Sequence, residues 1–118
     1  MRLSTITMIL AAGLIAATAQ AHAHLEKSTP AEGSTLTSAP AAFEVAFSEA
    51  ARLTALSIQK GREPRQAVKD LPATVDRTLR VALPTLTPGV YTLLWRAVAA
   101  DGHVSSGAVH FTISPSGR

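Results

Sequence analysis

The chain has 118 residues, no cysteine and two methionines, and 11 basic side chains stand against 8 acidic ones. This length suits one small domain, and the lack of cysteine excludes disulfides, thiolate catalysis and thiolate metal ligands. The charge excess is small and the basic residues are scattered, so the sequence does not indicate a nucleic-acid-binding surface.

The first 21 residues have the pattern of a secretory leader. Arg2 gives a positive start, residues 6–17 form an apolar run too short for a spanning helix, and residues 19–21 (Ala-Gln-Ala) form a small-x-small cleavage site. We therefore expect residues 1–21 to be a signal peptide and residues 22–118 to form one soluble, periplasmic domain. Cleavage after Ala23 satisfies the same rule, so the sequence leaves both sites open.

The rest of the chain reads as short strands separated by turns. Apolar and polar residues alternate in several segments, and no segment has a sustained helical period. We expect at most one helical turn, at residues 49–52. The pattern predicts an all-β fold, an immunoglobulin-like Greek-key sandwich or small barrel of about seven strands. The expected strands lie at residues 25–30, 43–49, 54–60, 79–83, 91–97 and 108–113, with weaker ones at 67–68 and 74–75.

Two features predict how this fold is held together. The run Leu-Thr-Pro-Gly-Val-Tyr at residues 86–91 resembles the tyrosine corner of immunoglobulin-like sandwiches. Trp95 falls on the same strand face as Tyr91, which predicts that it is the central aromatic residue of the core. Phe43, Phe47 and Phe111 supply the other aromatic rings.

A candidate metal site lies at the turn Asp101-Gly-His103. The two-residue spacing lets the carboxylate and the imidazole point the same way. If the mature chain begins at His22, the free amine and the ring of that residue can close a chelate on the same ion. Three nitrogens and one oxygen in a square suit Cu(II), although Zn(II) could use the same ligands in a tetrahedral site. Both methionines, Met1 and Met8, lie in the leader, so no thioether is expected.

Other polar residues have simpler interpretations. His110 is expected to be an outward strand residue, and His24 to be a surface residue or an outer-shell ligand. The carboxylates that we expect to be solvated are Glu26, Glu32 and Glu49. A serine hydrolase is an alternative, because Ser105 and Ser106 follow Asp101 and His103 closely in the sequence. The sequence has no nucleophile elbow, however, and residues so close together in one turn cannot easily form a catalytic triad.

Several motifs together resemble the CopC family of periplasmic copper-binding proteins. They are His-Ala-His-Leu at 22–25, Ser-Thr-Pro-Ala-Glu-Gly at 28–33, Phe-Ser-Glu at 47–49, the 86–91 run, Trp-Arg-Ala-Val at 95–98, and Asp-Gly-His at 101–103. The resemblance implies an immunoglobulin-like β-sandwich and one Cu(II) ion per chain. It assigns the ligands to the amine and ring of His22, to Asp101 and to His103.

Three functions follow from these patterns. The first is a periplasmic Cu(II)-binding protein for copper buffering, delivery or resistance, without enzymatic turnover and with a membrane copper transporter as a candidate partner. The alternative is a copper-dependent oxidative enzyme with a histidine brace. The third is a metal-free interaction sandwich, in which the histidines and Asp101 would be coincidental.

Overall fold

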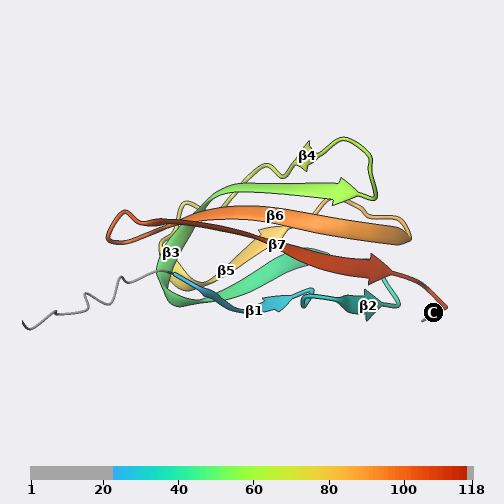
Figure 1. The fold of residues 1–118 in the computed structure, drawn as a ribbon, viewed down its shortest axis with the longest axis horizontal. Coiled ribbons are helices and arrows are strands. Elements are labelled where there is room, and N and C mark those ends of the chain that lie inside the picture. The colour runs from blue at the N-terminus through green and yellow to red at the C-terminus, as the bar shows by residue number, and fades with distance from the viewer. Residues whose placement is uncertain (1–22, 117–118) are drawn as a thin grey trace, which may run out of the picture.

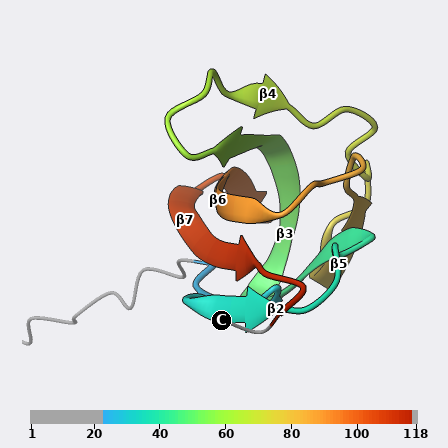
Figure 2. The ribbon, with the colours of Figure 1, turned by 90° about the vertical axis from the view of Figure 1, so that its right-hand side faces the viewer.

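The computed structural model describes residues 23–116, and in this part of the chain all regular structure is β-strand. The sheet order is β1-β3-β6-β7-β2, with β4 and β5 also pairing with β3. Figures 1 and 2 show how the strands curl around a shared interior. The predicted all-β class and the strand number are confirmed. The strands are β1 Leu25–Thr29, β2 Ser34–Leu36, β3 Ala42–Lys60, β4 Gln66–Ala67, β5 Asp76–Ala82, β6 Gly89–Ala99 and β7 Val104–Ile113.

The longest strand, β3, joins the two halves of the fold. Its first half pairs with β1 and β5, and its second half pairs with β6 and β4. The pairing register shifts between Ala46 and Ala51 against β5, and between Leu53 and Ala55 against β6. β3 changes direction at these irregularities, and Figure 2 shows the strand curving from the side of β4 to that of β5.

The predicted interruption at residues 49–52 is wrong. The two strands expected at 43–49 and 54–60 are one continuous strand, without a helical turn between them. Ala51 pairs with Asp76 on one side and with Ala99 on the other, and its side chain is fully buried. Pairing on both sides overrides the helical preference of an alanine-rich segment.

Three smaller boundaries also differ from prediction. Residues 74–75 are not in a strand, and β5 begins at Asp76. The weak strand expected at 67–68 is the short β4, Gln66–Ala67. β7 begins at Val104 instead of residue 108, because the whole of its first half pairs with β6. Long-range pairing therefore extends strands through residues with weak β-propensity.

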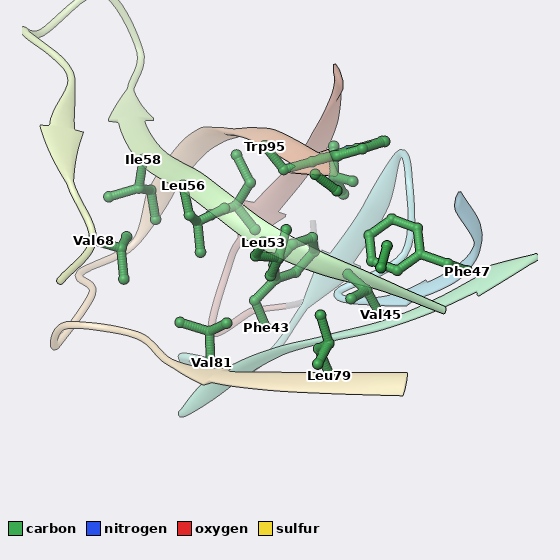
Figure 3. Close-up of a cluster of buried hydrophobic side chains, with 14 of the residues drawn as sticks. Phe43, Val45, Phe47, Leu53, Leu56, Ile58, Val68, Leu79, Val81 and Trp95 are labelled. Atoms are coloured by element: carbon green, nitrogen blue, oxygen red, sulfur yellow. The ribbon is translucent and has the colours of Figure 1, made fainter. Parts of the chain in front are cut away.

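The core is built from the inward faces that alternation predicts. Phe43, Val45 and Phe47 are almost completely buried, as are Leu56 and Ile58. Figure 3 shows these side chains converging from the two halves of β3. The cluster also contains Leu79, Val81, Tyr91, Leu93, Trp95, Val109 and Phe111.

The predicted tyrosine corner is confirmed. The hydroxyl of Tyr91 donates a hydrogen bond to the carbonyl oxygen of Thr87 at 2.7 Å and accepts one from its backbone nitrogen at 3.2 Å. The ring stacks on Phe111, with 5.4 Å between the centroids. These contacts fix the chain entering β6 to the core.

The side chain of Trp95, on β6, packs into the aromatic core, as predicted. It is 7% exposed and meets Phe47 edge to face, with 5.5 Å between the ring centroids. It stands opposite Gly107 of β7, and a Cβ atom at that glycine would lie 2.8 Å from the indole ring. Gly107 therefore provides the space in which the indole lies.

Candidate metal site

The site is built on the hairpin of β6 and β7. The two strands pair without a register shift from Gly89–Ile113 to Val98–Val104. At the end of the ladder the nitrogen of Ala99 donates to the carbonyl of His103 at 2.9 Å. Gly102 has φ of 92°, which an L side chain rarely adopts, so glycine allows this turn. The hairpin thus holds Asp101 and His103 at a fixed end of the molecule.

Asp101 and His103 are brought together, as predicted. One carboxylate oxygen, Oδ1, accepts a hydrogen bond from the backbone nitrogen of His103 at 3.0 Å, and Oδ2 lies 2.7 Å from Nδ1 of its ring. These bonds, the backbone one first, lower the pKa of Asp101 below its usual value. An ionised carboxylate accepts hydrogen bonds, so Asp101 binds the ring of His103 through a protonated Nδ1.

Both side chains are accessible. The side chain of His103 is 46% exposed and that of Asp101 is 39% exposed. A carboxylate bound to Nδ1 of a ring is too far from an ion on Nε2 of the same ring to bind it, so the hydrogen bond between Oδ2 and Nδ1 has to open when both residues bind one ion. The pair then supplies one nitrogen and one oxygen ligand to an ion at the surface.

The start of β1 lies beside this hairpin end. The carbonyl of His24 accepts a hydrogen bond from the nitrogen of Ser48 at 2.8 Å, and the carbonyl of Ala50 accepts one from the nitrogen of Ala100 at 3.3 Å. Alternate residues of a strand direct their backbone groups to the same side, so His24 and Ala100 both bind one edge of β3. Figure 1 shows the beginning of β1 and the β6–β7 turn at the same end of the fold.

The described residues do not complete a metal site by themselves. Between residues 23 and 116, no group of three or more His, Cys, Asp or Glu side chains is placed to hold one ion. The remaining predicted ligand, His22, and the signal peptide expected at residues 1–21 lie outside the described residues. The donors present nevertheless fit a metal that accepts nitrogen and oxygen.

A second carboxylate–imidazole pair was not predicted. Glu32 accepts from the backbone nitrogen of His110 at 2.9 Å, and its other oxygen lies 2.8 Å from Nδ1 of that ring. These bonds, the backbone one first, lower the pKa of Glu32. His110 points outward as expected, but Glu32 is not merely solvated. The partners are far apart in the sequence, so no local pattern could have indicated the contact.

This second pair is distinct from the first. His110 lies seven positions after His103, a span of about 23 Å in an extended strand. The nitrogen of Gly33 also donates to the carbonyl of His110, at 2.6 Å. Glu32 and Gly33 therefore clamp the turn before β2 onto β7, and this pair is best explained as structural.

The fold and the hairpin end define a class: a small β-sandwich protein with an exposed carboxylate–histidine pair at one end. Residues 25–114 match the family model of the CopC domain. Copper resistance protein C of Pseudomonas syringae pv. tomato is 38% identical over 122 residues, which cover 95% of this chain and 96% of that protein. The chain belongs to the CopC family, and the predicted membership is confirmed.

Solved structures support the same fold. The crystal structure of CopC from Methylosinus trichosporium OB3b gives a TM-score of 0.68 at 22% identity, over 79% of this chain and 94% of that one. The crystal structure of PcoC, a methionine-rich copper resistance protein from Escherichia coli, gives 0.60 at 28% identity, over 80% and 100%. In contrast to that protein, this sequence has no methionine after Met8.

Proposed function

We propose that this protein binds one Cu(II) ion in the periplasm, after removal of residues 1–21, and buffers or delivers it without chemical turnover. The ligands are the amine and ring of His22, a ring nitrogen of His103 and a carboxylate oxygen of Asp101. Three nitrogens and one oxygen suit the tetragonal preference of Cu(II). The names of related proteins, which refer to copper resistance and copper transport, support this role.

The observation that carries the proposal is the edge shared on β3. Ser48 and Ala50 bind the start of β1 and the end of the hairpin, respectively. The start of β1 therefore lies on the same edge of β3 as Ala100, the neighbour of Asp101, and Asp101 is joined to His103 by two hydrogen bonds. Capture of the ion then requires the side chains of Asp101 and His103 to exchange their mutual hydrogen bond for the ion, while the backbone of the hairpin is already in place.

Each residue has a separate task. Asp101 and His103 supply one oxygen and one nitrogen from the same turn. The negative charge of Asp101 also offsets part of the charge of the dication. The amine and ring of His22 close a chelate, and neither group is costly to deprotonate at neutral pH. The site lies at the surface, where the ion remains accessible to a partner such as a membrane copper transporter.

The decisive experiment compares two mature proteins. One begins at His22, and the other carries one extra glycine before His22, which keeps every side chain but displaces the amine. We expect the first to bind one equivalent of Cu(II) in a competition titration and the second to bind it more weakly by orders of magnitude. Equal binding by both would show that the amine is not a ligand.

A second measurement separates binding from catalysis. The copper-loaded protein is supplied with a reductant and oxygen, and peroxide formation and oxidation of a polysaccharide are followed. A carrier gives no more of either than free copper bound to a peptide chelator. Sustained turnover would favour the oxidative enzyme over the carrier.

A further inference from the structure

One edge of β7 is left unpaired along its first half. In the antiparallel ladder with β6, bonded and non-bonded pairs alternate, and the bond from Ala99 to His103 shows that the odd-numbered residues of β7 bond to β6. The even-numbered residues therefore direct their backbone N–H and C=O groups to the other side. Between residues 23 and 116, no strand pairs with β7 on that side before the register of β2 begins at Phe111. The unpaired backbone groups there belong to Val104, Ser106 and Ala108.

Both ends of this edge are closed, and they are closed symmetrically about Ser106. Four positions after it, the backbone groups of His110 are bonded to Glu32 and Gly33. Four positions before it, Gly102 lies in the turn of the hairpin, with a positive φ. Residues 104–108 are therefore named the free edge of β7.

The free edge lacks the features that keep other strand edges from pairing. Natural sheets protect exposed edges with charged residues, proline, bulges or short strands. β5 carries Arg77 and Arg80, β1 carries Lys27 and a register shift, and β2 and β4 have only three and two residues. The free edge has neither charge nor proline, and Val104 is 57% exposed. A groove of about 560 Å³ between β7 and residues 25–28 of β1 leaves room beside it.

We propose that the free edge of β7 binds the same edge of a second copy of this chain, as an antiparallel pair centred on Ser106. A two-fold axis at Ser106 pairs this residue with itself, and pairs Val104 with the partner's Ala108. These are hydrogen-bonded pairs that exchange two bonds each, so the contact forms about six backbone hydrogen bonds. It uses every unpaired backbone group of the free edge and ends where Gly102 and His110 close it.

A second copy fits this edge for a geometric reason. Pairing around a two-fold axis needs equal free lengths on both sides of the axis, and the free edge extends equally far on each side of Ser106. The side chains that face one another are small and uncharged: Val104 with Ala108, Ser105 with Gly107, and Ser106 with itself. The contact is short, so we expect a weak dimer that forms at high protein concentration. No proposed copper ligand takes part, so the pairing goes beyond the proposed function and does not depend on it.

A single cysteine tests the register, since the native chain has none. Residues of a hydrogen-bonded antiparallel pair have Cα atoms about 5.5 Å apart, within the range that a disulfide spans. Ser106→Cys should therefore form a covalent dimer under mild oxidation, with metals removed by a chelator. Thr92→Cys lies on the outward face of β6, away from any edge, and is the matched control that should stay monomeric. Equal cross-linking of the two variants would indicate random collision and overturn the proposal.

Sedimentation equilibrium from micromolar to millimolar concentration measures association without a cross-link. We expect a reversible dimer of the native protein. Ser106→Lys and Ser106→Glu should each weaken it by roughly fivefold, because like charges then stand opposite one another, and a mixture of the two should restore it. Ser106→Pro removes the central N–H of both copies but no bond to β6, and should abolish the dimer. Thr92→Lys should associate like the native protein.

Every outcome decides for or against the pairing. A native protein that stays monomeric over this range refutes it, as does a Ser106→Pro protein that dimerises normally. If Ser106→Pro does not fold, the charged variants decide, and failure of their mixture to restore the dimer overturns the proposal. Loss of the copper site would leave these metal-free measurements unchanged, so failure here and failure of the proposed function are distinguishable.

Discussion

At the scale of single residues, one arrangement occurs twice. Asp101 and Glu32 each accept the backbone nitrogen and approach Nδ1 of one histidine, His103 and His110 respectively. Both carboxylates have lowered pKa values for the same reason. The arrangement fixes the ring and its tautomer in both places. The two pairs differ in their surroundings: Ala100, the neighbour of Asp101, binds the same edge of β3 as His24, whereas Glu32 and His110 join the turn before β2 to β7.

Asp101→Asn should weaken Cu(II) binding. Asparagine keeps the shape of the side chain but removes the negative charge, and its amide nitrogen cannot accept from the ring. We expect a loss of about 10–100-fold in affinity, measured by competition titration. Glu32→Gln makes the same change on the other histidine and should leave copper affinity unaltered; an equal loss there would argue against the site at the hairpin.

Glu32 should make stability depend on pH in the acid range. Its pKa is lowered in the folded state from the usual 4.5, so the unfolded chain binds more protons at acid pH. The stabilisation is therefore present above the unfolded pKa and is lost as pH falls through the folded one. Denaturant unfolding between pH 2 and 6, about the range of carboxyl titration, should show a shallower decline for Glu32→Gln than for the native chain.

At the scale of elements, the position of the β6–β7 hairpin depends on close packing of Gly107 against the ring of Trp95. A Cβ atom at Gly107 would lie 2.8 Å from the ring of Trp95, which is itself buried against Phe47. The indole cannot move far without disturbing other core rings. The hairpin that carries Asp101 and His103 is thus positioned by packing well away from its turn.

Gly107→Ala should destabilise the protein by about 1–3 kcal/mol, the usual cost of overpacking a core. Chemical denaturation monitored by Trp95 fluorescence measures the change. Ser106→Ala alters the neighbouring, outward position and should change stability by less than about 0.5 kcal/mol. A neutral Gly107→Ala would mean that the indole has room to shift.

At the scale of the whole molecule, β3 is the element that relates the site to the fold. It passes from the β1–β5 half to the β4–β6 half, and its middle residues, Ser48 and Ala50, bind the start of β1 and the hairpin end. The tyrosine corner fixes the other end of β6. Stability and copper binding should therefore be separable, because they rest on opposite ends of the same sheet.

Tyr91→Phe tests this separation. It removes both hydrogen bonds to Thr87 and should lower the free energy of unfolding by about 1–3 kcal/mol. Copper affinity should not change, since the ring still stacks on Phe111 and the hairpin end is untouched. Thermal unfolding and copper titration of the same preparation check both statements. A parallel loss of copper binding would show that the two ends of the fold are coupled.

The buried strand faces and two local motifs could be predicted from the sequence alone. Alternation in residues 43–47 and 91–97 identified the buried faces, because side chains of a strand point to opposite sides whatever the strand pairs with. Local motifs identified the tyrosine corner, which joins Thr87 and Tyr91, and the pair formed by Asp101 and His103. In each case the interacting residues are neighbours in the chain, so local spacing carries the geometry.

Three other features could be found only from the three-dimensional structure. The continuity of β3 through Ala51, the clamp between Glu32 and His110, and the meeting of β1 with the hairpin along Ser48 and Ala50 all join residues distant in the sequence. Such contacts depend on which strands pair and in which register. No local propensity specifies that pairing, because it is set by burying every apolar face at once.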